Sequence, residues 1–379
     1  MTVIQILKRI ELFRGHLVLL AFVIVQGGSS CTKTTAATAG QDSTYFGRLS
    51  FVIKDNATFS NYYSALQMTG LLDTLSAAGP YTLLLADNNS YTGGYQISYG
   101  IPTGDLTSFI QSVGRPALSS YVAYAIVRGK WNLKALPLGD NQELPSIMGG
   151  TVYITRYLSG TDTVTTVNGL KIISYDNPAT NGSVNVLTGC LPNPQVYSTV
   201  MQKIQTDSNF AFFAAALKRT HLDTVLSGKG PFTVLAPSNS AFRAFSYNGL
   251  QLPINAQSID SILVADTAKL AQIVRYHILS GRYFLNDFRR RQTTDTLSLT
   301  MLNGEVLRYF TQPGTGLFPI IPGTPGFFGT GNLQSGGFWQ LTGLFYPSMY
   351  DNTHGYDVNS GDLPAANGVV HMLNSVLIP

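Results

Sequence analysis

The amino-acid sequence contains one pattern of residues twice, and this repetition constrains the fold more than any other feature. At a shift of 151 residues and without a gap, the matching pairs are Phe59 with Phe210, Leu66 with Leu217, Gly79-Pro80 with Gly230-Pro231, Thr82 with Thr233 and Asn88 with Asn239. Two later blocks match at shifts of 152 and 186 residues. A repeat of this length marks a duplicated structural unit. We therefore predict two copies of one domain, over residues 46–195 and 197–379.

Each copy begins with helical patterns and ends with strand patterns. In the second copy, apolar residues recur at helical spacing over 210–217, 241–245 and 270–277. Ser238 is in position to cap the second of these helices. The apolar and β-branched runs that predict strands cover 232–236, 305–310 and 368–378. Helices followed by strands indicate the α+β class.

Three blocks of the second copy resemble the signature of the fasciclin domain. They are residues 230–242 (GPFTVLAPSNSAF), the pair Tyr276-His277, and residues 367–379 (NGVVHMLNSVLIP). The resemblance implies two tandem fasciclin-like domains, each a β-sheet wedge flanked by helices, in a family of adhesion modules that need no cofactor. The residues that it marks as structural motif positions are Gly230, Pro231, Thr233, Ala236, Pro237, Asn239, Phe242, Asn367, Gly368 and His371.

The first copy departs from this signature and is a degenerate version of it. Residues 81–88 (YTLLLADN) lack the proline of the second copy. Ala125 stands where the second copy has His277, and Asn185 stands where it has His371. Family properties that depend on these histidines are therefore expected only of the second copy.

The histidines of the second copy have two interpretations. As core residues, His277 and His371 each pack against apolar neighbours and hydrogen-bond a backbone group. As a binding region, Tyr276 and His277 contact a ligand, because the resemblance places them where adhesion is located in eukaryotic family members. The sequence alone leaves both interpretations open.

The sequence lacks the spaced residue patterns that mark common catalytic and metal-binding sites, and it lacks the charge of a nucleic-acid-binding surface. The chain has no HExxH, CxxC or GxSxG motif, and its histidines after residue 31 are His221, His277, His354 and His371. Charged residues make up 12% and the formal net charge is +4, which is too little for a basic nucleic-acid-binding surface. We expect no enzymatic activity, no cofactor, no metal and no nucleic-acid partner.

The N-terminal residues resemble a bacterial (Bacteroidetes-like) lipoprotein signal. Lys8, Arg9 and Arg14 precede the nine apolar residues 17–25, a run too short to cross a membrane, and small residues then lead to Cys31. We expect a signal peptide over 1–30, a lipid on Cys31 and a flexible tether over 31–45. Gly28 departs from the usual leucine, and an ordinary secretory signal is the alternative. A lipid anchor in the cell envelope, at the outer membrane, is the expected localisation.

The second copy also carries an insertion. From Tyr124 to Asn181 is 57 positions and from Tyr276 to Asn367 is 91, a gain of 34. Within it, residues 309–350 form a Gly/Pro-rich aromatic segment with no charged residue over 42 positions.

This insertion has two interpretations. Either it is a loop whose aromatic side chains cover the wedge, or it is a partly exposed aromatic surface for a glycan, a protein or the membrane. Phe338 and Trp339 are the candidate ligand contacts. We expect the ends of the insertion to pair with the sheet of the second copy.

Together these features favour a non-enzymatic binding or adhesion module that is anchored in the envelope and recognises an extracellular protein, matrix or glycan partner. The alternative is an accessory glycan-binding lipoprotein of an outer-membrane nutrient-uptake system.

Overall fold

The computed structural model divides the chain into two units, Met1–Ser43 and Thr44–Pro379, and every described residue lies in the second unit. The described residues are 47–88, 118–189, 191, 196–247, 257–293, 297–311, 325–328, 342–343, 362–373, 376–377 and 379. We call residues 47–191 the first repeat and residues 196–379 the second repeat. None of the helices in these ranges has the length and apolar character needed to cross a membrane.

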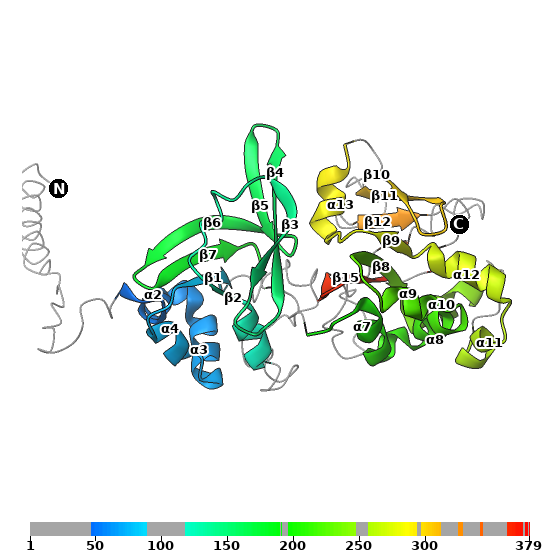
Figure 1. The fold of residues 1–379 in the computed structure, drawn as a ribbon, viewed down its shortest axis with the longest axis horizontal. Coiled ribbons are helices and arrows are strands. Elements are labelled where there is room, and N and C mark those ends of the chain that lie inside the picture. Colours follow the sequence, from blue (N-terminus) through cyan, green and yellow to red (C-terminus); the bar gives the residue numbers. More distant parts are fainter. Residues whose placement is uncertain are drawn as a thin grey trace, which may run out of the picture. The chain divides into compact units, whose positions relative to one another are not determined.

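The first repeat places a layer of short helices against one sheet. Its elements are α2 (Leu49–Asp55), η2 (Ala57–Phe59), α3 (Ser60–Thr69), α4 (Leu72–Ser76), β1 (Tyr81–Ala86), a helix that includes residues 118–124, β2 (Ile126–Arg128), β3 (Gly139–Pro145), β4 (Thr151–Ser159), β5 (Asp162–Val167), β6 (Leu170–Ala179) and β7 (Gly182–Leu187). The described strands form a seven-stranded sheet in the order β2-β1-β7-β6-β5-β4-β3. Figure 1 shows α2, α3 and α4 gathered on one side of β1 and β7.

Strand β6 makes this sheet continuous. Its first residues, Leu170 and Lys171, pair with β5, and the part that ends at Ala179 pairs with β7. Two irregularities interrupt the register of β6 with β7, between Ile172 and Ser174 and between Ser174 and Asn177, and such bulges bend a strand. The strand therefore turns the corner between the two halves of the wedge without a break.

The second repeat also places helices before strands, but it adds helix α13 after its second strand and forms two sheets. Its elements are α7 (Val200–Thr206), η4 (Ser208–Phe210), α8 (Ala211–Arg219), α9 (Leu222–Leu226), β8 (Phe232–Pro237), α10 (Asn239–Tyr247), α11 (Ile259–Leu263), α12 (Thr267–Arg275), β9 (Ile278–Ser280), α13 (Leu285–Arg291), β10 (Leu297–Thr300), β11 (Val306–Thr311), β12 (Pro325–Phe328), β13 (Thr342–Gly343), β14 (Leu363–Ala365) and β15 (Gly368–Leu373). In the described ranges the sheet orders are β14-β15-β8-β9 and β10-β11-β12-β13.

The strand that closes the main sheet differs between the two repeats. Pro364-Ala365 of β14 corresponds to Pro178-Ala179 of β6 at the shift of 186 residues. In the second repeat the insertion precedes β14, so β13 pairs with β12 while β14 pairs with β15. The end of the long strand β6 thus has a three-residue counterpart, β14, which pairs with β15 as the end of β6 pairs with β7.

Apolar residues form a core on each side of the sheet β14-β15-β8-β9, which we call the main sheet of the second repeat. One cluster joins helices α7, α8 and α12 to the sheet through residues such as Phe213, Val234 and Ile273. The other lies between the two sheets and under α13, and it includes Tyr276, Phe288 and Tyr309. The first repeat has a single large cluster that spans its helices and sheet.

Most of the predicted elements are confirmed. Helices α8, α10 and α12 and strands β8 and β11 lie where the apolar spacing indicated, and the Ser238 hydroxyl accepts the Ala241 N–H at 3.2 Å as a helix cap. The predicted strand over 368–378 is too long, because β15 ends at Leu373. Its partner strand β8 also ends there, at Pro237, the residue that pairs with Leu373.

The start of the insertion pairs within the second repeat, as expected, in the sheet β10-β11-β12-β13. Strand β11 pairs with β10 and β12, and Thr311 lies opposite Pro325. Pro325 is the first residue of β12, a position in a strand that tolerates proline. Phe338 and Trp339 lie outside the described residues.

Candidate functional site

The signature residue Thr233 attaches the segment after β9 to strand β8. Its hydroxyl donates to the Gly281 carbonyl at 2.7 Å and accepts the Tyr283 N–H at 3.0 Å. Thr82 makes the equivalent pair of bonds in the first repeat. One threonine in each repeat thereby holds the segment that follows the edge strand β2 or β9.

Asn367 of the closing block joins three parts of the second repeat. Its side-chain oxygen accepts the Val200 N–H at 2.7 Å, and its side-chain nitrogen donates to the carbonyls of Leu226 and Gly228 at 2.9 and 2.7 Å. Asn181 makes the same three kinds of bond in the first repeat. This asparagine therefore fixes the start of the first helix against the end of the helical layer.

Five further signature residues, Asn239, Gly230, Gly368, Ala236 and Phe242, are also structural. The Asn239 side chain accepts the Phe212 N–H at 3.0 Å and donates to the Ser208 carbonyl at 2.7 Å. A Cβ on Gly230 would lie 2.0 Å from the Asn367 carbonyl oxygen, so only glycine fits. Gly368 is equally confined by Phe232, and Ala236 and Phe242 are buried in the core.

Tyr276 and His277, the candidate binding residues, are fully buried. The Tyr276 hydroxyl donates to the Val306 carbonyl at 2.8 Å. His277 Nδ1–H donates to the Ile273 carbonyl at 2.8 Å, and its Nε2 accepts the Leu377 N–H at 2.9 Å. Burial lowers the pKa of His277 to about 4, so the ring is neutral at pH 7. In this fold neither side chain reaches a ligand unless the core opens.

Replacement of His277 by alanine is expected to lower the free energy of unfolding by about 1–3 kcal/mol at pH 7. The variant leaves the Ile273 carbonyl and the Leu377 N–H without their partner and loses the packing of the imidazole on Phe213. Urea unfolding measures the loss. A variant with unchanged stability but defective ligand binding would instead support the binding role.

His371, on strand β15, is also fully buried. Its Nε2–H donates to the Tyr283 carbonyl at 2.8 Å, and its Nδ1 accepts the Asp362 N–H at 3.2 Å. Burial lowers the pKa of His371 to about 4. Asn185 accepts the Asp176 N–H at 3.0 Å in the same way, so the degenerate first repeat keeps the acceptor while it lacks the histidine.

Asp362 is a buried carboxylate beside His371. Its Oδ1 accepts the Leu285 N–H at 2.8 Å, and its Oδ2 has no hydrogen-bond partner in the part of the chain that the structure describes. The backbone φ of 51° is in the left-handed region. Burial raises the pKa of Asp362 to about 7.

A polar surface that was not predicted from the sequence joins the two repeats, and Arg282 lies at its centre. Arg282 is buried, with 6% of its surface exposed. Its guanidinium donates to the carbonyls of Ala365, Ala366 and Gly368 at 2.7–2.8 Å. Its Cζ lies 3.7 Å from the centre of the Tyr153 ring of the first repeat. Arg282 thus connects the turn between β14 and β15 to the sheet of the other repeat.

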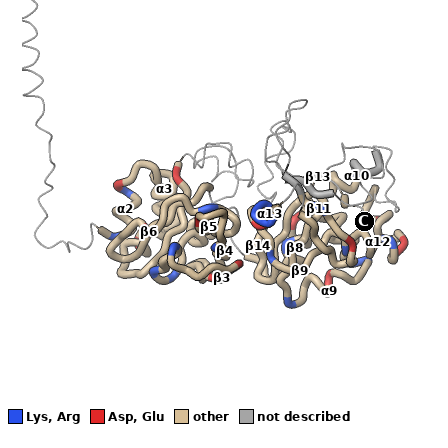
Figure 2. Tube along the Cα trace, turned by 90° about the horizontal axis from the view of Figure 1, so that it is seen from above, with Lys and Arg blue, Asp and Glu red and all other residues tan. Residues whose placement is uncertain are grey.

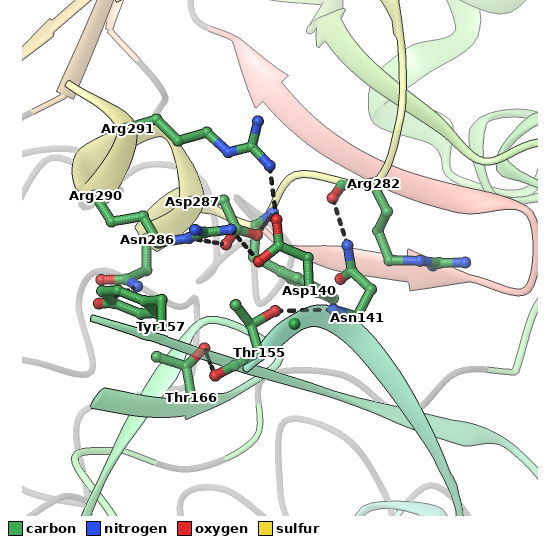
Figure 3. Close-up of polar contacts among 12 residues, drawn as sticks. Asp140, Asn141, Thr155, Tyr157, Thr166, Arg282, Asn286, Asp287, Arg290 and Arg291 are labelled. Atoms are coloured by element: carbon green, nitrogen blue, oxygen red, sulfur yellow. Dashed lines mark hydrogen bonds and ion pairs between the residues drawn. The ribbon is translucent and has the colours of Figure 1, made fainter. Parts of the chain in front are cut away.

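Helix α13 supplies the ionic part of this contact (Figure 3). Arg290 and Arg291 each form an ion pair with a different oxygen of Asp140 on β3, at 2.6 and 2.7 Å. Arg290 also pairs with Asp287 of its own helix at 2.9 Å. Figure 2 shows basic residues gathered at α13. The pairs explain why a run of arginines is placed there.

Close packing completes the contact between the repeats. Tyr153 and Phe284 are 2% and 1% exposed, and their ring centres are 6.1 Å apart. A Cβ on Gly169 would lie 2.9 Å from the Phe284 Cβ, and the φ of Gly169 is +84°. The Asn141 side chain donates to the Arg282 carbonyl at 2.9 Å. We call Asp140, Asn141, Tyr153, Tyr157 and Gly169, with Arg282, Phe284, Asn286, Arg290 and Arg291, the inter-repeat interface.

The signal for this interface was present in the alignment of the two copies. At the shift of 152 residues Arg282 matches Lys130, which is exposed. Three consecutive arginines, 289–291, also stand out in a chain with 12% charged residues. The interface is suited to holding protein surfaces together, since its charged groups are engaged in ion pairs, backbone hydrogen bonds and ring contacts.

Comparison with known proteins places the chain in a family. The fasciclin domain model matches residues 57–192 and 208–315, which is more than half of the chain and covers both repeats. The transforming growth factor-beta-induced protein ig-h3 of Sus scrofa is 23% identical over 338 residues, which are 84% of this chain and 40% of that protein. Protein sll1483 of Synechocystis sp. is 26% identical over 182 residues, 48% of this chain and 73% of that protein.

A solved domain pair is also similar. The FAS1 domain pair of the insect cell adhesion molecule fasciclin I covers 86% of this chain and 98% of that chain at 16% identity, with a TM-score of 0.36. This chain spans less than half the length of the Sus scrofa relative. The predicted family and the α+β fold with two tandem domains are confirmed by the match to both repeats, and the chain belongs to the fasciclin-domain family.

Proposed function

We propose that this protein is a non-enzymatic binding or adhesion module, held at the cell envelope by a lipid on Cys31. The observation that carries the proposal is the use of the fasciclin fold in both repeats, together with the internal use of its polar groups. The side chains of His277, His371 and Asn367 all hydrogen-bond backbone groups of the second repeat. The outer surfaces of the two repeats are the parts that remain for recognition.

The inter-repeat interface supports the proposal in a second way. There the second repeat uses the segment after β9 and helix α13 to hold a folded sheet through a cation on a tyrosine ring and a doubly paired carboxylate. Aromatic rings and arginine are the residue types that dominate protein interfaces. The second repeat thus already binds one folded surface, the sheet of the first repeat in the same chain.

Replacing Cys31 by alanine is expected to move the protein from the detergent phase into the soluble fraction, because several acyl chains on one cysteine give stable membrane attachment. Phase partitioning of cell extracts measures the change, and Cys190→Ala is the matched control. If the Cys31 variant still partitions with membranes, the anchor is not a lipid on this residue.

The soluble Cys31→Ala protein also tests the binding function. We expect it to bind saturably to at least one component when immobilised and presented with envelope proteins and purified polysaccharides in parallel. Binding that requires residues 313–343 would locate the site in the insertion and, if the bound component is a polysaccharide, would favour the nutrient-uptake alternative. An enzymatic change in any presented component would contradict the proposal.

A further inference from the structure

The segment that docks in the second repeat has an uncovered counterpart in the first. Thr82 and Thr233 hold the two segments by the same pair of hydrogen bonds, so they begin alike. Trp131 stands in the place of Tyr283, and Lys130 in the place of Arg282. We call residues 128–138 the basic loop. The second repeat buries its version of this element against a protein surface, whereas the first repeat leaves it open.

Cations and apolar side chains are exposed together on the basic loop. Arg128, Lys130 and Lys134 are all exposed, and none of them forms an ion pair with another described residue. Trp131 is 36% exposed and Leu138 is 53% exposed. The loop contains no acidic residue. Such a surface is complementary to one that carries carboxylates.

The Trp131 ring is held in place before any partner arrives. Its Nε1–H donates to the Arg128 carbonyl at 2.8 Å, and its backbone N–H donates to the Thr82 hydroxyl at 2.8 Å. Gly129 has a φ of +92°, and a Cβ there would lie 3.1 Å from the indole nitrogen. A preorganised aromatic side chain loses little conformational entropy on binding.

A second copy of the chain is a poor partner for this loop. The Tyr124 hydroxyl donates to the Thr151 carbonyl at 2.7 Å in the first repeat, and the Tyr276 hydroxyl donates to the Val306 carbonyl at 2.8 Å in the second. Thr151 and Val306 are therefore equivalent positions. Two residues further along, the first repeat has Tyr153, which is already covered by Arg282, and the second has Arg308. Arg308 would repel Lys130.

We propose that the basic loop is a docking surface for an acidic surface of another protein, with Trp131 as its apolar contact and Lys130 and Lys134 as its ionic contacts. The proposal rests on the binding function above and specifies the chemistry of its partner. A folded protein partner fits best because the equivalent element of the second repeat packs on a sheet that bears a carboxylate, Asp140, and tyrosine rings.

A random copolymer of glutamate and tyrosine serves as the acidic polypeptide probe for the full-length protein. The chain has two tryptophans, so Trp339→Phe makes Trp131 the sole reporter of binding. We expect the copolymer to change the Trp131 emission saturably and to bind more weakly as salt is raised. Lys130→Glu with Lys134→Glu should weaken binding at least tenfold. The matched control, Lys218→Glu with Lys229→Glu, makes the same change of charge at exposed positions of the second repeat and should alter binding less than twofold.

Two competing partners are included as separate arms, alginate for acidic polysaccharides and phosphatidylglycerol vesicles for anionic membranes. Tighter binding of either one than of the copolymer, or equal losses in the two double variants, would overturn the proposal. Circular dichroism establishes that each variant is folded. An envelope component that binds the lysine double variant as well as the parent protein would refute the basic loop and leave the general binding function standing.

Discussion

Replacing Arg282 by alanine is expected to lower the free energy of unfolding by about 3–5 kcal/mol. The variant leaves three backbone carbonyls at the β14–β15 turn without their donor and removes a cation from the face of Tyr153. A buried, charge-assisted hydrogen bond contributes about 1.5–3 kcal/mol, and unpaired buried acceptors add to the cost of its loss. Urea unfolding followed by circular dichroism measures the difference.

The duplication provides a matched control for this experiment. Lys130 occupies the position of Arg282 in the first repeat and is exposed, so Lys130→Ala should change stability by less than about 0.5 kcal/mol. Arg282→Lys should recover only part of the loss, because an ammonium lacks the planar fork that meets three carbonyls. A loss below about 1 kcal/mol for Arg282→Ala would show that the interface is not held by this residue.

A double-mutant cycle separates the contact between repeats from the contacts within the second repeat. Tyr153→Ala removes the ring and leaves the three carbonyl bonds of Arg282 intact. We expect a coupling energy between Arg282 and Tyr153 of about 1–2 kcal/mol, in the range of a desolvated cation–π pair. Additive losses would mean that Arg282 acts only inside its own repeat.

The parent protein is expected to lose stability as the pH rises and Asp362 ionises, and the Asp362→Asn variant is expected not to show this loss. The pKa of Asp362 is raised to about 7 in the folded protein by burial, against about 3.9 in an unfolded chain. The folded state therefore holds the proton more tightly, and the stability from this residue is full below about pH 4 and lost as the pH rises to about 7. The difference corresponds to about 4 kcal/mol.

The test compares unfolding of the two proteins across pH. The free energy of unfolding of the Asp362→Asn variant minus that of the parent should increase by about 4 kcal/mol between pH 4 and pH 8. The titration of the Asp362 carboxyl carbon by nuclear magnetic resonance gives the pKa independently. Parallel stability curves for the two proteins, or a carboxyl that titrates near pH 4, would show that its buried Oδ2 is paired or solvated.

Much of the fold could be read from local patterns. The residues that recur at helical spacing over 210–217 became helix α8, and the run that begins at Phe232 became strand β8. The signature positions Thr233, Asn239 and Asn367 have structural roles in hydrogen bonds that their counterparts in the first repeat also make. Such features depend on short-range spacing and on a pattern that is written twice, so the sequence contains them directly.

The status of the candidate site residues depended on tertiary surroundings. The sequence allowed His277 to be either a core residue or a ligand contact. The structure surrounds it with the Ile273 carbonyl, the Leu377 N–H and the Phe213 ring. Leu377 is 100 positions away in the chain. No spacing rule could have supplied that partner.

The sequence by itself determined the duplication, the α+β class, the family and the structural signature residues, because each of these is encoded in local periodicity or in a block of adjacent positions. Only the tertiary structure decided how the two copies differ in use. Arg282 and Lys130 are equivalent in sequence, yet one is buried on Tyr153 while the other stays exposed. The burial of a cation is a property of the surface that meets it, and here that surface is supplied by residues more than a hundred positions away.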